Sequence, residues 1–276
     1  MNAEDRSVAD AVASQRDQIA QLISMTEDAF RRDGRLFYVG AGTSGRLGVL
    51  DASECPPTFG SDPEMVQGII AGGFPALLRA QEGAEDSPTG GAAVMDEHNI
   101  GERDVVIGIA ASGTTPFVHG AVERARQRGA RTGFIACTPI PEKASAYVDV
   151  AVIAIVGPEV VTGSTRLKAG TATKLILNMI TTGAMIRIGK TYGNLMVDLK
   201  ATNEKLRDRS ERIVAEVCDV PREKARELLA AADKRVKTAI VMHKLGVDRD
   251  GALRALADAG GVIRRVVPDA PPPVIS

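Results

Sequence analysis

The chain has 276 residues, a formal net charge of −1 and 44% apolar residues, enough for one large domain or for an α/β domain with a small appendage. It has no Trp, 3% aromatic residues and no basic block, which argues against a nucleic-acid partner. Three scattered cysteines indicate neither a disulfide framework nor a zinc site, and no segment resembles a signal peptide or a membrane span, so we expect a soluble cytoplasmic protein without a membrane partner.

Short apolar runs alternate with helical patterns along the first two thirds of the chain. Helical spacing covers residues 8–31 and ends near Asp33-Gly34. Strands are then predicted at 36–39, 66–71, 104–110, 132–137 and 150–155, and helices at 44–53, 76–81, 117–127 and 168–188. Single helices between strands imply right-handed crossovers, which give a parallel sheet with helices on both faces.

The last part of the chain has a different pattern. From residue 202 to 261 helical patterns follow one another without strands, and a proline-rich tail comes after them. We therefore divide the chain into an N-terminal helix (1–33), an α/β domain (34–200), a helical C-terminal subdomain (201–266) and a disordered tail (267–276).

The loop after the first predicted strand carries Gly40, Gly42 and Gly45, with Thr43 and Ser44 between them. Glycines let backbone N–H groups approach an anion, a following helix adds positive partial charge, and hydroxyls donate to phosphate oxygens. The glycine spacing also satisfies the dinucleotide fingerprint, but the second strand ends in glycines where that fingerprint needs a carboxylate. A phosphate site is the favoured interpretation, with a dinucleotide site or an ordinary tight turn as alternatives.

A second loop of the same design follows the third predicted strand. Ser112, Thr114 and Thr115 offer hydroxyls, Gly113 permits close approach, and Pro116 fixes the first helical turn. A single loop of this kind is as typical of an ordinary capped helix as of a phosphate site. Two at the carboxyl ends of parallel strands predict a phosphosugar pocket in a crevice of the sheet.

Two glutamates follow strands whose ends should face this crevice. Glu54 lies in the first helix of the sheet domain, just before Pro56 and Pro57, which we expect to end that helix. Glu85 belongs to an acidic run after the second strand. Taken singly, each is typical of a solvated helix surface. General acid–base chemistry at a sugar carbon, however, commonly uses two carboxyl groups.

A third polar segment leads into the long helix at 168–188 and contains Ser164, Arg166 and Lys168. Cations at a helix N-terminus oppose the helix dipole unless they serve an anion. The two bases are therefore either ligand contacts or plain surface residues.

Together these segments resemble the N-acetylmuramic acid 6-phosphate etherases over about residues 34 to 265. The resemblance rests on six motifs, namely Val39-Gly-Ala-Gly-Thr-Ser-Gly-Arg46, Asp51-Ala-Ser-Glu-Cys-Pro-Pro-Thr58, Glu82-Gly-Ala-Glu-Asp86, Gly108-Ile-Ala-Ala-Ser-Gly113, Val160-Val-Thr-Gly-Ser-Thr-Arg-Leu-Lys-Ala-Gly-Thr-Ala172 and Gly193-Asn-Leu-Met-Val-Asp-Leu-Lys-Ala-Thr-Asn-Glu-Lys-Leu206.

The resemblance implies a sugar-isomerase (SIS) fold, a three-layer α/β/α sandwich with a parallel five-stranded sheet, related to the glucokinase regulatory protein. It also implies a small ubiquitin-associated-like helical bundle at the C-terminus and a homodimer. The implied reaction cleaves the C3 lactyl ether of N-acetylmuramic acid 6-phosphate, giving N-acetylglucosamine 6-phosphate and D-lactate, without a metal or other cofactor.

It further implies roles for individual residues. Glu54 would donate the proton to the departing lactate, and Glu85 would be the other acid/base. Thr43, Ser44, Ser112, Gly113 and Thr115 would hold the 6-phosphate. Ser164, Arg166 and Lys168 would line the sugar and lactyl pocket, and Glu204 would be a further contact.

Two departures from the family pattern bear on these expectations. Thr114 stands where the family usually has Arg, and the chain begins at Asn2-Ala-Glu-Asp without the extra Asn- and Ser-rich segment that usually precedes the first helix. Two other functions of the same pocket stay open. One is a non-catalytic phosphosugar sensor, and the other is an aldose–ketose phosphosugar isomerase.

Overall fold

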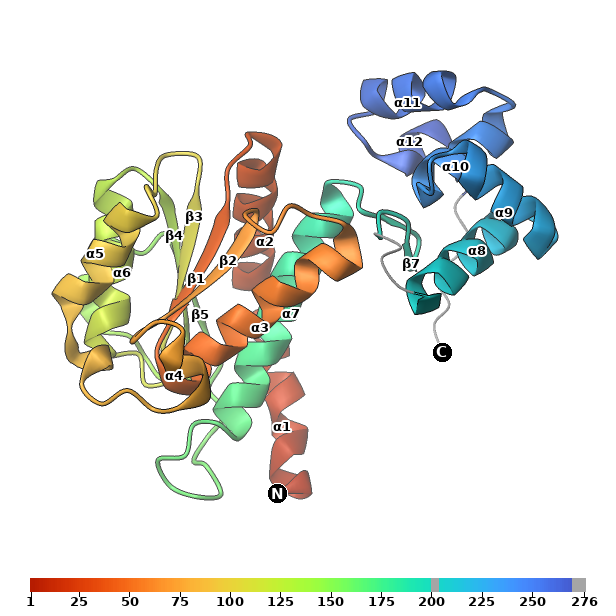
Figure 1. The fold of residues 1–276 in the computed structure, drawn as a ribbon. Helices are drawn as coiled ribbons and strands as arrows, with labels where there is room; N and C mark the ends of the chain where they lie inside the picture. Colours follow the sequence, from red (N-terminus) through yellow and green to blue (C-terminus); the bar gives the residue numbers. More distant parts are fainter. Residues whose placement is uncertain (200–203, 270–276) are drawn as a thin grey trace. The chain divides into compact units, whose positions relative to one another are not determined.

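The computed structural model describes residues 1–199 and 204–269 (Figure 1). The chain divides into two units, one formed by residues 1–54 and 62–184 and the other by residues 55–61 and the chain from 185 onward. The predicted domain boundary at 200/201 and most of the predicted disordered tail lie outside the described residues. The domain limits given above therefore stay predictions.

The first unit is built on one parallel sheet of five strands in the order β2-β1-β3-β4-β5. Its strands are β1 (Leu36–Gly40), β2 (Val66–Ile70), β3 (Val105–Ile109), β4 (Arg131–Ala136) and β5 (Val150–Ile153). All five lie within one or two residues of the predicted limits, because each is a short, largely apolar segment, and β1 and β3 are buried throughout as expected of strands covered on both faces.

Helices cover both faces of the sheet, as Figure 1 shows. Phe37 and Val39 point to the face under α5 (Pro88–Glu97) and α6 (Pro116–Gln127), where they join an apolar core. The other face meets α2 (Arg16–Arg31), α3 (Gly42–Phe59) and α7 (Lys168–Arg187); for example, the Tyr38 hydroxyl donates to the Leu177 carbonyl at 3.4 Å. The predicted three-layer α/β/α SIS sandwich is confirmed.

Shorter elements complete the first unit. They are α1 (Asn2–Ala13), α4 (Pro75–Leu78) and 3-10 helices at Ala84–Asp86 and Glu142–Ala146. The helical pattern predicted as one element over 8–31 is thus two helices, α1 and α2, separated at Ser14 and Gln15.

The first helix after β1 is longer than predicted. Pro56 and Pro57 lie inside α3, which continues to Phe59, so the expectation that they end the helix was wrong. The fixed φ of proline is itself helical, and only its missing N–H and its ring oppose an interior position. The helix instead stops before Gly60, whose φ of 61° is left-handed.

Helix α5 was not predicted, because Pro88, Gly90 and Gly91 resemble a loop. Ser87 caps it by accepting from the Gly90 N–H at 3.0 Å, and Pro88 takes the first position, where no N–H is needed. Gly91 has a packing role. A Cβ there would lie 1.9 Å from the Phe117 carbonyl oxygen of α6, so only glycine allows the close contact of the two helices.

The second unit is helical apart from a short antiparallel hairpin, β6 (Thr191–Tyr192) and β7 (Leu195–Met196). Helices α8 (Glu204–Cys218), α9 (Arg222–Ala231), α10 (Val236–Leu245), α11 (Arg249–Asp258) and α12 (Ile263–Val266) share one apolar core. Lys237 is buried there, and its ammonium donates to the carbonyls of Gly189 and Gly261 and to the Asp198 carboxylate. This confirms the expected helical C-terminal region.

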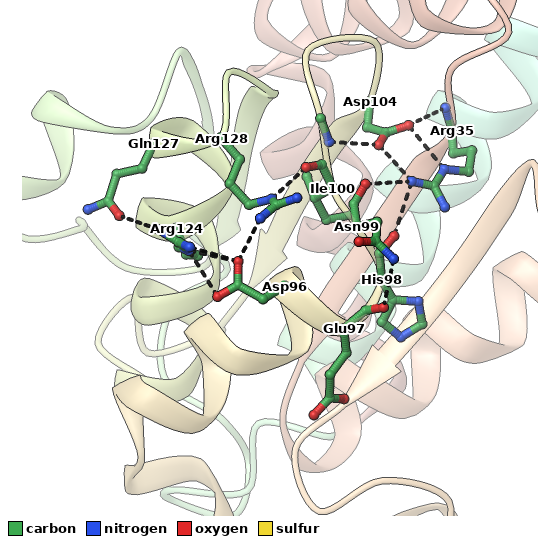
Figure 2. A network of polar contacts seen from close by, with 11 residues as sticks. Arg35, Asp96, Glu97, His98, Asn99, Ile100, Asp104, Arg124, Gln127 and Arg128 are labelled. Carbon is green, nitrogen blue, oxygen red and sulfur yellow. Dashed lines mark hydrogen bonds and ion pairs between the residues drawn. The ribbon is translucent and has the colours of Figure 1, made fainter.

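A polar network closes the amino-terminal edge of the sheet (Figure 2). The carboxylate of Asp104 accepts from the Arg35 side chain, from the Arg35 backbone N–H and from the Gly101 N–H, at 2.8–3.1 Å. Arg35 also donates to the His98 carbonyl at the end of α5. The network thereby joins the starts of β1 and β3 at the edge opposite the two hydroxyl-rich loops.

Candidate active site

The candidate site lies at the carboxyl ends of β1 and β3. After β2 is added on one side of β1, the following strands are added on the other side, starting with β3. Open α/β sheets bind ligands in the crevice between two strands where the strand order switches in this way. A cavity of about 390 Å³ opens there. The side chains and loops that line it are Ala41, Gly42, Thr43, Ser44, Glu85, Asp86, Ile109, Ala110, Ala111, Ser112, Thr114, Thr115, Pro116, Gly163 and Thr165.

The first wall is the turn from β1 into α3. A Cβ on Gly40 would lie 2.6 Å from the backbone nitrogen of Gly45, so this tight turn requires glycine. Because α3 begins at Gly42, Thr43 and Ser44 occupy its first turn, where backbone N–H groups have no helical partner. Their hydroxyls and these N–H groups face the cavity together, which is the arrangement that binds a phosphate.

The opposite wall is the turn from β3 into α6. Ser112 and Thr114 share a hydroxyl–hydroxyl hydrogen bond at 3.2 Å, and Thr115 stands directly before the first turn of α6. Gly113 holds a left-handed φ of 71°, and its carbonyl is bound by the His119 imidazole at 2.8 Å. His119 thus holds the turn from the core side, while Ser112, Thr114 and Thr115 line the cavity.

Glu85 lies at the rim of the cavity, in the short 3-10 helix after α4. It also lines a neighbouring cavity of about 180 Å³ with Arg46. Arg46 itself holds the preceding segment, since its guanidinium donates to the carbonyls of Ala76 and Leu77 at 2.6 and 3.0 Å. Glu85 and its neighbour Asp86 are therefore both placed beside the two hydroxyl-bearing turns.

Glu54 lies elsewhere in the same chain. It is ten positions after Ser44 on α3, about 15 Å along the helix axis, and it lines a separate cavity of about 210 Å³ between α3 and α7. The two cavities share no lining residue. A single chain thus brings together the two hydroxyl-rich loops and Glu85, but not Glu54.

Asp51, one turn before Glu54, is the buried carboxylate of that second cavity. It accepts from the Asn178 amide at 2.6 Å and from the Thr181 hydroxyl at 3.3 Å. Burial raises its pKa, although both hydrogen bonds act in the opposite direction.

The third polar segment reaches the cavity through residues other than those predicted. Gly163 and Thr165 line it, whereas their neighbours Ser164 and Arg166 do not. Lys168 is buried, and its ammonium donates to the Glu4 carboxylate of α1 at 2.8 Å. The structure does not bring this lysine to the cavity.

A carboxylate, not a ligand, occupies the start of α7. Glu159 accepts from the backbone N–H groups of Lys168 and Ala169 at 2.9 and 3.0 Å. Glu204 is exposed at the start of α8, in the second unit.

Three cavity residues with polar side chains were not among the assigned site residues, namely Asp86, Thr114 and Thr165. Each is adjacent in sequence to a predicted residue. Thr114 had been counted among the hydroxyls of the second loop and as a departure from the family pattern, but it was not given a binding role. Their signal in the sequence is the hydroxyl-rich or acidic run to which each belongs.

Other kinds of site were also considered. Among residues 1–199 and 204–269, no group of three or more His, Cys, Asp or Glu side chains is placed to hold a metal ion, and no helix is long and apolar enough to cross a membrane. The cysteines are buried, and burial raises the pKa of the Cys137 thiol to about 11, far from a reactive thiolate.

Comparison with known proteins agrees with this geometry. The model of the glucokinase regulatory protein N-terminal SIS domain matches residues 17–126. The N-acetylmuramic acid 6-phosphate etherase of Trichormus variabilis is 54% identical over 96% of this chain and 86% of its own length. That of a Synechocystis species is 51% identical over 98% and 88%. The chain belongs to the N-acetylmuramic acid 6-phosphate etherase family.

Solved structures show a more distant likeness. The phosphoheptose isomerase GmhA from Neisseria gonorrhoeae has 17% sequence identity and a TM-score of 0.47, over 66% of this chain and 93% of its own. The curated etherases, in contrast, match both the SIS unit and the helical C-terminal region, because their alignments cover nearly the whole chain.

Proposed function

We propose that this protein is a carbon–oxygen lyase that acts on N-acetylmuramic acid 6-phosphate in the cytoplasm. It cleaves the bond between C3 and the lactyl ether oxygen and releases D-lactate and N-acetylglucosamine 6-phosphate. The observation that carries the proposal is the pair of hydroxyl-bearing turns that face one cavity with Glu85 at its rim. The reaction is taken from the name of the relatives described above, N-acetylmuramic acid 6-phosphate etherase.

The turns from β1 and β3 bind the 6-phosphate. Thr43 and Ser44 on one side and Ser112 and Thr115 on the other offer hydroxyl donors, and the first turn of α3 adds free N–H groups and positive partial charge. Gly113 contributes by shaping the second turn, since its own N–H donates to the Ala110 carbonyl at 2.8 Å. Phosphate held in this way positions the sugar carbons near Glu85 without a metal ion. Such fixed positioning lowers the entropic part of the barrier.

The reaction proceeds by elimination and addition. The open-chain aldehyde at C1 makes the C2 hydrogen acidic, and a carboxylate removes that proton. The C3–O bond then breaks, and the leaving oxygen takes a proton from a carboxylic acid. Water adds across the resulting C2–C3 double bond, with its hydroxyl at C3 and a proton at C2, so one water is consumed for each ether cleaved. We assign Glu54 as the acid toward lactate and Glu85 as the other acid/base.

Two copies of the chain form each complete site in this proposal. Glu54 lines a cavity on the α3–α7 face, away from the phosphate loops of its own chain. Large apolar side chains are exposed on this face, with Leu50 52% and Met179 44% accessible. A homodimer that covers them can bring Glu54 of one chain to the phosphate cavity of the other.

Incubation of the protein with N-acetylmuramic acid 6-phosphate, followed by an assay for D-lactate, tests the function. We expect lactate release from the wild type and loss of release in Glu54→Ala and Glu85→Ala, with unchanged circular dichroism. Binding of the phosphosugar without lactate would instead indicate a sensor. Formation of a ketose from a hexosamine phosphate would indicate an isomerase.

A further inference from the structure

The cavity around Glu54 contains a cation and an amide that the mechanism above does not use. It is formed by α3 and α7, and its lining residues are Leu47, Leu50, Asp51, Glu54, Lys174, Leu177 and Asn178. One side of this cavity is therefore apolar, and the other carries two carboxyl groups, one lysine and one amide. Of these polar groups, the lysine and the amide are the ones that can donate hydrogen bonds to an anionic group.

Lys174 is a positive charge without a hydrogen-bond partner. It is exposed, and among residues 1–199 and 204–269 it makes no hydrogen bond or ion pair. Its charge acts on the buried Asp51 only through space, against the burial that raises the pKa of that carboxyl, while Asn178 and Thr181 supply the hydrogen bonds to Asp51. The ammonium of Lys174 is thus available to an incoming anion.

Asn178 is held in one orientation. Its Nδ2 donates to Oδ1 of the buried Asp51 at 2.6 Å, which uses one of its two amide hydrogens. The second N–H and the amide oxygen remain for the cavity that Asn178 lines. Asp51 therefore acts as a fixed support that keeps an amide donor beside Lys174 and Glu54.

We propose that Lys174 and Asn178 bind the carboxylate of the lactyl group, so that the α3–α7 cavity selects the lactyl ether. This inference rests on the proposed function. The lactyl carboxylate is joined to the ether oxygen through one carbon, so an acid that protonates this oxygen must lie close to a second carboxyl group. Once that acid has given up its proton, the two carboxylates repel each other, and a neighbouring cation offsets the repulsion.

The apolar side of the cavity fits the rest of the leaving group. Leu47, Leu50 and Leu177 offer a surface for the lactyl methyl group. N-acetylglucosamine 6-phosphate has no lactyl group, so the product loses these contacts once the ether is cleaved. Lys174 and Asn178 thus determine specificity at the leaving-group end, while the phosphate loops hold the other end.

A substrate analogue distinguishes binding of the lactyl carboxylate by Lys174 from a loss of activity that does not depend on this carboxylate. We compare N-acetylmuramic acid 6-phosphate with its lactyl amide, in which a neutral carboxamide replaces the carboxylate. For Lys174→Ala and Lys174→Gln we expect kcat/KM on the acid to fall by about tenfold or more, which corresponds to the loss of one charge-assisted hydrogen bond. We expect kcat/KM on the amide to change little. Lys143→Ala, which removes an exposed lysine outside both cavities, serves as the control and leaves both values unchanged.

Binding provides a second measurement. Calorimetry with N-acetylglucosamine 6-phosphate should give the same affinity for the wild type and for Lys174→Gln, because that ligand has no lactyl carboxylate. Inhibition by D-lactate should weaken in the variant.

The proposal is overturned if Lys174→Gln lowers kcat/KM equally on acid and amide, or if it lowers neither while the wild type releases lactate. In both cases the etherase function would stand and only the assignment of Lys174 would fail. A wild type that releases no lactate from N-acetylmuramic acid 6-phosphate would overturn the proposed function and this inference with it.

Discussion

The imidazole of His119 contacts the carbonyl oxygen of Gly113 through Nε2 at 2.8 Å. A carbonyl only accepts, so Nε2 carries the proton, and in the neutral ring Nδ1 accepts from the Tyr147 hydroxyl at 2.9 Å. The ring is buried and stacks on Phe134, with centroids 4.9 Å apart. A chain of two hydrogen bonds thereby holds the second phosphate turn from inside the core.

We expect His119→Ala to raise KM for the phosphosugar about tenfold, with a smaller effect on kcat, because the turn loses its support and binds phosphate less well. Tyr147→Phe removes only the outer hydrogen bond and should have a weaker effect in the same direction. Steady-state kinetics measure both. Equal losses of kcat in the two variants with unchanged KM would contradict the positioning role.

Ser44→Ala and Ser112→Ala each remove one hydroxyl from the walls of the phosphate cavity. A hydrogen bond to a charged group contributes about 1.5–3 kcal/mol, so KM should rise by about tenfold or more in each variant, with kcat largely kept. Ser145→Ala provides the control, since its hydroxyl binds the Glu142 carbonyl in a 3-10 helix outside the cavity. Loss of kcat at unchanged KM would contradict phosphate binding by these serines.

The Glu4–Lys168 contact predicts a dependence of stability on pH. The hydrogen bond and charge of Lys168 hold the pKa of Glu4 below its ordinary value of 4.5. A carboxyl with a lowered pKa in the folded state stabilises it above the unfolded pKa, and this contribution is lost as the pH falls through the folded pKa.

Glu4→Gln should therefore lower Tm at pH 7, and its difference from the wild type should shrink in acid. Asp10→Asn, on the same helix, changes an exposed carboxylate that has no side-chain partner among the described residues and serves as the control. Thermal scans between pH 7 and pH 3 provide the measurement. A Tm difference that stays constant over this range would contradict the ion pair.

The network in Figure 2 contains a matched pair of aspartates for a stability test. The side chain of Asp104 is 7% exposed and that of Asp96 is 43% exposed. Asp104→Ala should lower the free energy of unfolding by about 3 kcal/mol, because it leaves Arg35 and two backbone N–H groups without their acceptor. Asp96→Ala should cost much less, because its ion pairs with Arg124 and Arg128 are exposed to solvent. Urea unfolding measures both, and similar losses would contradict this difference in burial.

The sequence was sufficient for the sheet and for most of the polar residues that line the cavity at the ends of β1 and β3. Its strands are apolar runs bounded by turn residues, and the hydroxyl-rich loops follow β1 and β3 directly in sequence. Parallel pairing then brings these loops to one edge. Local pattern and global arrangement agree here, so Thr43, Ser44, Ser112 and Thr115 could be placed without the structure.

Long-range contacts explain what could not be predicted. Lys168 resembles a ligand-binding base at a helix start. Its ammonium instead forms an ion pair with Glu4, which lies far away in the sequence. Gly91 resembles a loop residue, but it is required where α5 approaches the Phe117 carbonyl of α6. In each case the deciding contact comes from a separate element, which spacing within one segment does not reveal.

Complementation between two inactive variants tests most directly the claim that a phosphosugar site is assembled from two copies of the chain. Glu54→Ala and Glu85→Ala are co-expressed with different affinity tags, and the mixed dimer is purified and assayed for D-lactate release. In a mixed dimer one site carries both substitutions and the other carries neither, so we predict about half of the wild-type rate per dimer. A mixed dimer as inactive as either parent would contradict the account.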